Sequence, residues 1–328
     1  MKAIYIDKFG SAENLELREV PDLSAPSGTQ VLVRVRAAGL NRADLLQVRG
    51  LYPPPFGYSA NIPGLEFAGE ITAIGGYVDL FKTGDRVFGI TAGEAQAEYM
   101  LVDASLLTII PTNLSFTAAA AIPEAFITAH DAIFTLGDLK AGETLLVHAV
   151  GSGVGLAALQ MAKVKGATVL GTSRTAGKLT ECIQLGLNTG ITTENVIDFS
   201  ATVKEKTGNG GADVILDLVG AAYFQENLAS LALKGRLILV GLTSGSTAEF
   251  NLSLALHKRA RIIGTVLRSR RVDEKAEATR RFATDIIPLF ESGAIVPNVD
   301  RIFPVGDVIA AYKYLESNAS FGKVVLEF

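Results

Sequence analysis

The chain has 328 residues, of which 48% are hydrophobic and 20% charged, and its net charge is −4. This length suggests about two domains, each with its own core. The acidic balance argues against nucleic acid as a partner, because nucleic-acid-binding domains carry basic surfaces. The single cysteine, Cys182, excludes an intrachain disulfide and any metal site built from several cysteines.

The opening residues, MKAIYIDKFG, predict a first strand and contain no apolar signal segment. Together with the single cysteine, they favour a cytoplasmic protein. The most apolar stretch, residues 144–162, approaches the length of a membrane span, but three glycines and the polar His148, Ser152 and Gln160 interrupt it. We therefore expect a buried strand and helix there, and no membrane partner.

The pattern of apolar residues changes near residue 122. Before it, short alternating segments separated by Gly, Pro, Asn and Asp predict a β-rich region, with strands at 31–37, 66–74, 86–90 and 97–102. Up to about residue 267, strands then alternate with helices, which indicates a parallel sheet with right-handed crossovers. Its strands are expected at 144–148, 168–172, 214–218, 236–240 and 261–266, and helices at 178–185 and 224–232. The tail adds helices at 274–292 and 308–316 and extended segments at 301–304 and 323–327.

A glycine-rich turn, Gly151-Ser152-Gly153-Val154-Gly155, lies between the strand at 144–148 and a helical pattern. Backbone amides at such a helix start form an anion site that suits the pyrophosphate of a dinucleotide. The GxGxxG fingerprint is imperfect, because Leu156 stands at its third glycine. By itself the turn fits a cofactor loop and an ordinary strand–helix connection equally well.

The residues after the next strand bear on which dinucleotide would bind. A typical NAD site has an acidic residue about 20 positions after the first glycine, and here that distance falls on GTSR at 171–174, which holds no carboxylate. Ser173, Arg174 and Lys178 instead offer a hydroxyl group and two cations, as a 2′-phosphate requires. This favours NADPH, although Arg174 and Lys178 also fit solvated residues at a helix start.

Little in the sequence suggests nucleophilic or hydrolytic catalysis. There is no GxSxG elbow, no pair of carboxylates suggests hydrolysis, and Cys182 is expected to be a buried, inert thiol within a helix. His148 follows a buried strand and fits a hydrogen-bonded core histidine better than a catalyst. A dinucleotide site without a nucleophile, a metal or an evident acid indicates hydride transfer.

Four segments carry a resemblance to a known family: LNRAD at 40–44, IPGLEFAG at 62–69, GDRV at 84–87 and the glycine-rich turn. Their order resembles the medium-chain dehydrogenase/reductase superfamily over essentially the whole chain. Zinc-dependent members use a Cys and a His where this chain has Asn41 and Leu65, and their four-cysteine zinc lobe is absent. Neither side chain can supply a thiolate or an imidazole, so we expect no metal site.

Within that superfamily the chain looks most like the zinc-free quinone oxidoreductases, especially the tumour-suppressor-inducible group. The shared segments include NRADL at 41–45, GLYPP at 50–54, AIPEA at 121–125, LRSR at 267–270 and GKVVL at 322–326. The resemblance implies an α/β fold with a doubly wound Rossmann sheet plus a β-rich GroES-like catalytic domain. It implies a GroES-like domain at 1–122, a Rossmann domain at 123–267 and a return to the catalytic domain at 268–328.

The resemblance also implies roles for individual residues. The residues expected to bind the cofactor are Thr128, Ser152, Gly153, Val154, Ser173, Arg174, Lys178, Leu242, Leu267, Ser269 and Asn318. The residues at 152–154 would contact the pyrophosphate, those at 173–178 the 2′-phosphate, and Thr128 the nicotinamide carboxamide, with the last four along the cofactor cleft. Thr193 stands where relatives often have a tyrosine beside the adenosine phosphate, which leaves use of NADH open.

Asn41 and Tyr52 would face the substrate as the catalytic residues. Read without the resemblance, Asn41 and Asp44 also fit caps of a turn or helix, Asp44 also fits a partner of Arg42, and Tyr52 fits an exposed aromatic on a proline-stiffened loop. The basic residues Arg268, Arg270 and Arg271 are expected to border the cofactor cleft rather than to bind coenzyme A.

The function implied is an NADPH-dependent quinone oxidoreductase that transfers hydride from nicotinamide C4 to an o- or p-quinone without a metal. Reduced quinone is a phenolate with a pKa near that of tyrosine, about 10, so it needs less stabilisation than an alkoxide. An NADPH-dependent enoyl or alkenal reductase and a non-enzymatic NADPH-binding protein are the alternatives.

The segment that starts at Ala260 and ends at Arg268, ARIIGTVLR, is expected to form the last strand of the parallel sheet. A bare apolar edge strand invites pairing with another chain. Pairing with its own copy across a two-fold axis would cover it, so we expect a homodimer.

Overall fold

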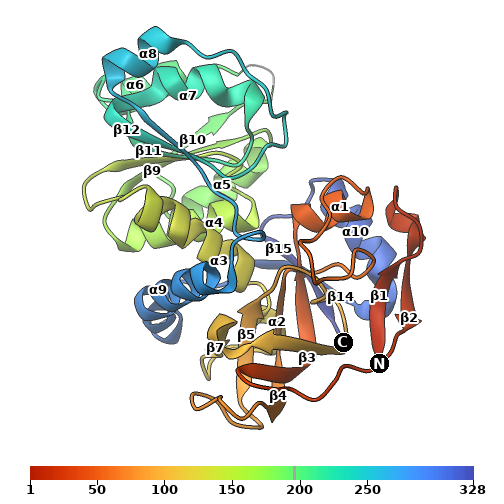
Figure 1. The fold of residues 1–328 in the computed structure, drawn as a ribbon. Coiled ribbons are helices and arrows are strands. Elements are labelled where there is room, and N and C mark those ends of the chain that lie inside the picture. Colours follow the sequence, from red (N-terminus) through yellow and green to blue (C-terminus); the bar gives the residue numbers. More distant parts are fainter. Residues whose placement is uncertain (195–196) are drawn as a thin grey trace. The chain divides into compact units, whose positions relative to one another are not determined.

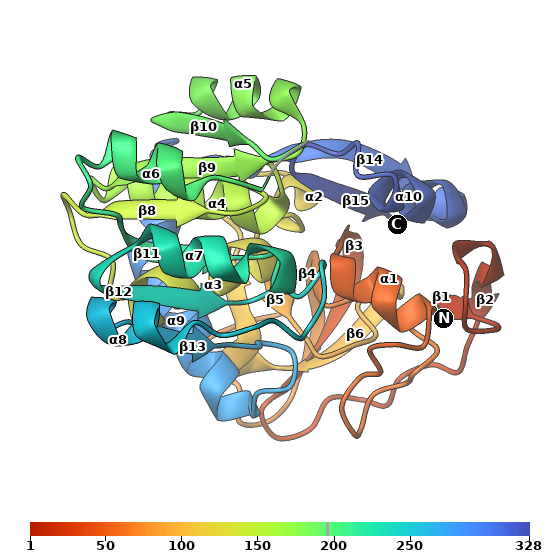
Figure 2. The same cartoon turned by 90° about the horizontal axis from the view of Figure 1, so that it is seen from above.

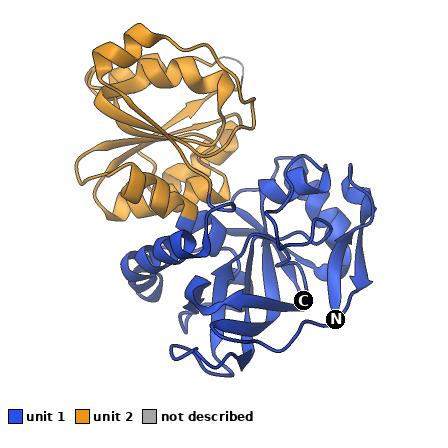
Figure 3. Ribbon diagram, in the orientation of Figure 1, with its two compact units in different colours: residues 1–127, 267–328 blue, residues 128–266 orange. Residues whose placement is uncertain are grey.

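The computed structural model describes residues 1–194 and 197–328. The backbone separates into two compact units (Figure 3). The first unit is Met1–Ile127 with Leu267–Phe328, and the second is Thr128–Val266. The domain boundaries that the sequence predicts, after residues 122 and 267, remain predictions. Among the described residues, no helix combines the length and apolar character that crossing a membrane requires.

The second unit is built on a six-stranded sheet in which every neighbouring pair of strands is parallel. Its strands are β8 (Thr144–Val147), β9 (Thr168–Ser173), β10 (Thr189–Thr192), β11 (Ala212–Asp217), β12 (Leu231–Leu239) and β13 (Arg261–Gly264). Figure 2 shows them side by side in the order β10-β9-β8-β11-β12-β13. The chain thus adds strands first on one side of β8 and then on the other, as doubly wound dinucleotide-binding sheets do.

Helices cover both faces of this sheet (Figure 1). One face carries α6 (Ser200–Lys206), α7 (Phe224–Ser230) and α8 (Leu252–Lys258), and the opposite face carries α4 (Gly153–Val164). The chain passes from β9 to β10 through α5 (Ala176–Gln184). Because both faces are covered, the inner strands are apolar runs, and Leu145, Leu146 and Val147 of β8 are all completely buried.

The first unit contains a largely antiparallel, seven-stranded sheet of the GroES-like kind. Its strands follow the order β14-β15-β3-β4-β5-β7, with β6 paired to β3. They are β3 (Gln30–Leu40), β4 (Glu66–Ile74), β5 (Arg86–Ile90), β6 (Tyr99–Asp103), β7 (Leu107–Ile109), β14 (Val299–Pro304) and β15 (Lys323–Glu327), beside the hairpin of β1 (Lys2–Ile6) and β2 (Leu15–Glu19). In the antiparallel pair of β15 and β3, Val324 lies opposite Leu40, which brings the end of the chain beside residues 40 and 41.

The helices of the first unit are α1 (Arg42–Val48), α2 (Phe116–Ala119), α9 (Val272–Glu291) and α10 (Val308–Glu316). Helix α3 (Pro123–His130) begins in this unit, ends in the second, and is followed by a π-helical turn, Asp131–Leu136. Both segments are described by their own bonds and contacts.

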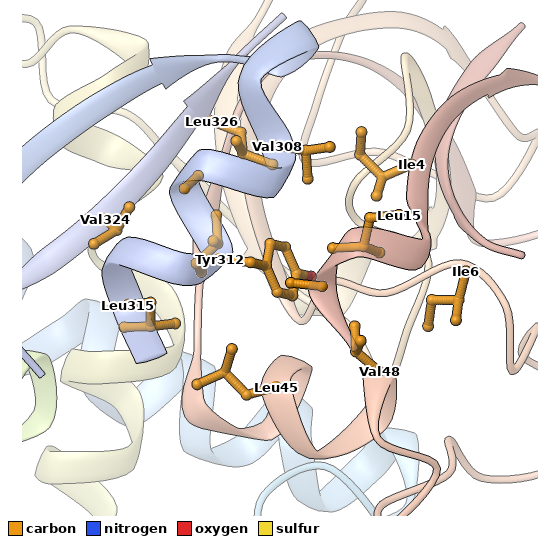
Figure 4. Packing of buried hydrophobic residues seen from close by; sticks show 13 residues of the cluster. Ile4, Ile6, Leu15, Leu45, Val48, Val308, Tyr312, Leu315, Val324 and Leu326 are labelled. Carbon is orange, nitrogen blue, oxygen red and sulfur yellow. The ribbon is translucent and has the colours of Figure 1, made fainter. Parts of the chain in front are cut away.

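A hydrophobic core gathers around Tyr312 of α10 (Figure 4). Side chains from β1, α1 and β15, among them Ile4, Leu45 and Val324, point toward its ring. The Tyr312 hydroxyl group is buried and donates a hydrogen bond of 3.0 Å to Gln96 Oε1, so its polar atom is satisfied. This core fixes the C-terminal strand and helix α1 to the same sheet, and these two elements carry the polar cluster described below.

Candidate cofactor site and active site

The glycine-rich turn follows β8 and is bonded to the strands on both sides. The His148 N–H donates to the Leu216 carbonyl group at the end of β11, and the Val150 N–H to the Thr172 carbonyl group of β9, both at 3.0 Å. Helix α4 then begins at Gly153, with Ser152 as its N-cap, whose Oγ accepts the Gly155 N–H at 3.2 Å. The start of α4 therefore lies at the carboxyl edge of the sheet, beside the point where the strand order reverses.

Gly155 explains how the turn packs closely against the helix despite the leucine at position 156. A Cβ atom at Gly155 would lie 2.6 Å from the carbonyl oxygens of both Ala149 and Val150. Ala149 itself has a φ of 48°, in the left-handed region. The turn folds back on the helix so tightly that only glycine fits, so the close-packing role of a third glycine falls to Gly155. The free N–H groups at the start of α4 retain the capacity to bind an anion.

Ser173, Arg174 and Lys178 lie where β9 ends and α5 begins, on the strand next to β8. The Ser173 side chain is buried and exchanges hydrogen bonds with the backbone of Thr175, accepting at 3.1 Å and donating at 3.2 Å. Arg174 is exposed, and Lys178 is half-buried in the first turn of α5. Carboxyl ends of neighbouring parallel strands lie at one edge of a sheet, so these residues share an edge with the start of α4.

Thr193 is buried, and its hydroxyl oxygen accepts a hydrogen bond of 2.6 Å from the Tyr223 hydroxyl group. An ordered hydroxyl group, and not an aromatic ring, thus occupies the position after β10. That the protein can also use NADH remains a prediction.

The other residues predicted to bind the cofactor differ in their surroundings. The Thr128 hydroxyl group, on α3, is buried and has no hydrogen-bond partner among the described residues. Leu242 and Ser269 are exposed, whereas Leu267 is buried. The Asn318 side chain accepts a hydrogen bond from the Arg42 guanidinium group and donates one to the Glu316 carbonyl group at 3.0 Å.

Asn41 and Asp44 define the start of α1. The Asn41 backbone N–H donates to Asp44 Oδ2 at 2.8 Å, and the Gly64 N–H donates to Asp44 Oδ1 at 3.1 Å. Asp44 is completely buried, and burial raises its pKa to about 6. The interpretation of Asp44 as a helix cap is therefore confirmed, and the cap also fastens the loop before β4 to α1.

Lys323 forms the centre of a polar cluster on the first unit. Its ammonium group donates to the Leu40 carbonyl group at 2.7 Å and to Asn41 Oδ1 at 2.6 Å, and it forms an ion pair of 2.5 Å with Glu66 Oε1. Asn41 Nδ2 donates to the same Glu66 oxygen at 2.9 Å. Both charged side chains are buried, so the ion pair is shielded from solvent.

Two glutamates that are far apart in the sequence, Glu66 and Glu124, come together in the structure. The Glu124 backbone N–H, at the start of α3, donates to Glu66 Oε2 at 2.7 Å, which brings the two glutamates together beside Asp44. Burial, and then the charge of Glu66, raise the pKa of Glu124 to about 8. The sequence analysis did not predict this cluster, because its acids come from three segments, α1, β4 and α3, that are far apart in the chain.

Arg268 anchors the loop that carries Tyr52. Its Nε donates to the Ala92 carbonyl group at 2.8 Å, its Nη1 to the Tyr52 carbonyl group at 2.9 Å, and its Nη2 to Gln47 Oε1. The guanidinium carbon lies 4.8 Å from the centre of the Tyr52 ring. These donors are buried and bind the chain itself, and the expectation that Arg268 borders the cofactor cleft stays a prediction. Tyr52 is half-buried, and burial raises its pKa.

His148 and Cys182, which we did not expect to be catalytic, have the surroundings expected of core residues. His148 is completely buried, with Nδ1 2.9 Å from Thr172 Oγ1 and Nε2 2.5 Å from Asn227 Oδ1. Cys182 is buried within α5, and burial raises its pKa to about 12, which disfavours the reactive thiolate. In the described part of the chain, no three His, Cys, Asp or Glu side chains are arranged to hold a metal ion.

A doubly wound sheet with a glycine-tight turn onto a helix, joined to a GroES-like sheet, defines a dinucleotide-dependent oxidoreductase fold. Comparison with known proteins agrees. The family model "Alcohol dehydrogenase GroES-like domain" matches residues 27–112, and "Zinc-binding dehydrogenase" matches residues 153–284. The quinone oxidoreductases of Homo sapiens and Lama guanicoe are 31% and 34% identical, over 99% of this chain and 97% of each relative.

Solved structures give the same assignment. The Escherichia coli quinone oxidoreductase complexed with NADPH is similar with a TM-score of 0.89 and 28% identity over 100% of both chains. CurK enoyl reductase is similar with a TM-score of 0.88 and 25% identity, over 99% of this chain and 98% of that one. The chain belongs to the medium-chain dehydrogenase/reductase superfamily and is an oxidoreductase of that family.

Proposed function

We propose that the chain is an NADPH-dependent quinone oxidoreductase that works in the cytoplasm without a metal. The observation that carries the proposal is the edge of the parallel sheet where α4 begins. Helix N–H groups there suit a pyrophosphate, and Ser173, Arg174 and Lys178 stand beside them, without a carboxylate, at the end of β9. The relatives named quinone oxidoreductase, one of them complexed with NADPH, support the same function.

The residues present fit a nicotinamide dinucleotide. The crowded contact at Gly155 keeps the start of α4 tightly folded, so backbone groups can approach a phosphate closely. The buried hydroxyl group of Thr128 has no partner among the described residues, and a nicotinamide carboxamide would satisfy it. We propose that the pyrophosphate is held by Ser152, Gly153 and Val154. The cofactor cleft would be lined by Leu242, Leu267, Ser269 and Asn318. When bound, NADPH supplies a hydride from nicotinamide C4.

We propose that Asn41 and Tyr52 face the substrate as the catalytic residues. The Asn41 carboxamide group is fixed by Glu66 and Lys323, and its remaining hydrogen makes only a long contact of 3.4 Å with the Gly39 carbonyl group. That hydrogen can be donated to the carbonyl oxygen of an acceptor. The Tyr52 ring is held by Arg268 on a loop with three consecutive prolines, which limits its motion.

An enoyl or alkenal reductase is the second candidate, because CurK enoyl reductase is among the similar structures. Initial rates of NADPH oxidation with 1,4-benzoquinone or 9,10-phenanthrenequinone, compared with crotonyl-CoA, separate the two. We expect turnover of the quinones and no loss of rate after treatment with a chelator. Turnover of crotonyl-CoA alone would contradict the proposal. Tight NADPH binding with no turnover of any quinone or enone would instead indicate a non-enzymatic nucleotide-binding protein.

A further inference from the structure

Glu124 lies within a group of titratable side chains of which the proposed hydride transfer uses only Tyr52. Its nearest carboxylate is Glu66 of β4, and Asp44 of α1 and Lys323 of β15 also act on its charge. From the other elements, Lys275 of α9 acts on it as well. Tyr52 and Arg268 in turn respond to the charge of Glu124. All seven residues belong to the first unit.

Glu66 and Glu124 differ in what they bind. Glu66 has a buried ion pair with Lys323 and accepts N–H groups from Asn41 and Glu124. The Glu124 carboxyl group makes no hydrogen bond or ion pair with the residues that the structure describes, and it is half-buried. Two neighbouring carboxylates do not both ionise readily, and the unpaired one keeps its proton. Glu124 is therefore the member of the pair that can hold an exchangeable proton.

Lys275 is a cation of this cluster that lies on α9. The residue is buried, with a relative exposure of 3%, and it acts on Glu124 through its charge. Burial lowers the pKa of Lys275, whereas the charge of Glu124 raises it. The positive charge of Lys275 favours the carboxylate form of Glu124, so it would stabilise a transient Glu124 carboxylate.

Helix geometry relates Glu124 to the cofactor residue Thr128. Both are in α3 (Pro123–His130), four residues apart, so their side chains lie on one face of the helix, one turn from each other. Thr128 has the buried hydroxyl group proposed to orient the nicotinamide carboxamide. Glu124 would therefore be a proton donor one helical turn from that hydroxyl group.

We propose that Glu124 is the general acid that protonates the reduced substrate, an inference that rests on the proposed quinone reduction. The hydride brings two electrons to the quinone, and one oxygen atom of the product takes up the proton of the Glu124 carboxyl group. The O–H bond of Glu124 breaks as the product O–H bond forms, and the Glu124 carboxylate is then reprotonated from solvent. Lys275 and Lys323 stabilise that carboxylate while it exists.

The first test is the pH dependence of quinone turnover in wild type and in Glu124→Gln. The acid must be protonated to act, so wild-type kcat is expected to fall as the pH rises through about 8, the pKa of Glu124. Glu124→Gln should lower kcat by about 100-fold, the low end for general acids, and should abolish this alkaline fall. The dissociation constant of NADPH, from fluorescence titration, should change little. Glu277→Gln, a surface carboxylate beside Arg280 and Arg281, is the matched control and should behave as wild type.

A second variant should shift the alkaline fall in kcat instead of abolishing it. Lys275→Met removes a cation that favours the Glu124 carboxylate, so the alkaline fall in kcat should move to higher pH. This result does not depend on whether Glu124→Gln folds. An unmoved alkaline fall in folded Lys275→Met would contradict the proposal.

Stability gives a readout that needs no cofactor. Because the pKa of Glu124 in the folded protein is raised, its ionisation opposes folding as the pH increases from about 5 to 9. Glu124→Gln should therefore gain stability relative to wild type over this range in urea unfolding. A constant difference would contradict the electrostatic basis of the proposal.

The outcomes separate the two claims. If wild type does not reduce quinones, the proposed function fails. If wild type is active and Glu124→Gln retains both its rate and its alkaline fall, the function stands and the role of Glu124 is overturned.

Discussion

Lys323 is the residue on which the polar cluster of the first unit depends. It satisfies Glu66, Asn41 and the Leu40 carbonyl group at once, from the first position of β15. Removing one partner of a buried ion pair leaves the other charge uncompensated, at a cost of about 3–5 kcal/mol. Lys323→Met should destabilise the protein by this amount in urea unfolding.

The matched control for Lys323 is Lys313→Met. Lys313 pairs with Glu13 at 2.9 Å, but both side chains are more than half exposed, and such pairs contribute little to stability. Glu66→Gln added to Lys323→Met should restore part of the lost stability. Equal effects of the two lysine substitutions would contradict a structural role for the buried pair.

Lys178 tests the proposed preference for NADPH. A cation that binds the 2′-phosphate contributes to the affinity for NADPH and not for NADH, and a charge-assisted hydrogen bond corresponds to about tenfold in affinity. Lys178→Ala should raise the dissociation constant of NADPH by about this factor in fluorescence titration and leave that of NADH unchanged. Lys140→Ala, an exposed lysine paired with Asp138, is the control. An equal loss for both cofactors would argue against recognition of the phosphate.

For single residues, the sequence predicted the environments of some side chains and missed those of others. A histidine after an apolar strand and a cysteine within a helix were predicted to be buried, because both stand in locally apolar segments. The ion pair of Glu66 with Lys323 was not predicted, since the two residues are 257 positions apart and come together only because β3 pairs with β15 on one side and with β4 on the other. The contacts of Arg268 with Gln47, Tyr52 and Ala92 were not predicted for the same reason.

Among the elements, the turn between β8 and α4 is the most constrained. A Cβ atom at Gly155 would overlap the carbonyl oxygens of Ala149 and Val150, so Gly155→Ala should cost about 1–3 kcal/mol and weaken NADPH binding. Gly177→Ala in α5 is the matched control, because nothing lies within 4 Å of its Cβ position. There the loss of backbone freedom in the unfolded chain should add about 0.4–1 kcal/mol of stability. Calorimetry and fluorescence titration measure both effects, and tolerance of Gly155→Ala would contradict the close packing.

The strands that the sequence predicted best are those buried on both faces, since they form apolar runs such as residues 144–147. The prediction missed β10 (Thr189–Thr192), which is short and includes two threonines and a glycine, and it missed β2 (Leu15–Glu19), whose side chains are mostly exposed. The helix expected at 224–232 ends at Ser230, and Leu231 already belongs to β12. Here the pairing of the strand with β11 determines where the helix stops.

For the whole molecule, the edge strand β13 (Arg261–Gly264) leads us to propose a homodimer. It pairs with β12 on one side, and the neighbouring helix α8 has Leu252 and Leu256 exposed by 70% and 72%. Analytical ultracentrifugation should show a dimer at micromolar concentration. Ile262→Lys places a charge on the edge strand and should shift the protein toward the monomer. A wild type that is monomeric under these conditions would contradict the proposal.

The central claim, that this oxidoreductase transfers a hydride from NADPH to a quinone, is tested most directly with NADPH that carries deuterium at nicotinamide C4. In stopped-flow experiments with 9,10-phenanthrenequinone, we expect the deuterated cofactor to be oxidised more slowly, and only when one particular face of C4 is labelled. Thr128→Val should lower the rate and retain the isotope effect. Absence of quinone-dependent oxidation, or oxidation without any isotope effect in a single turnover, would contradict the account.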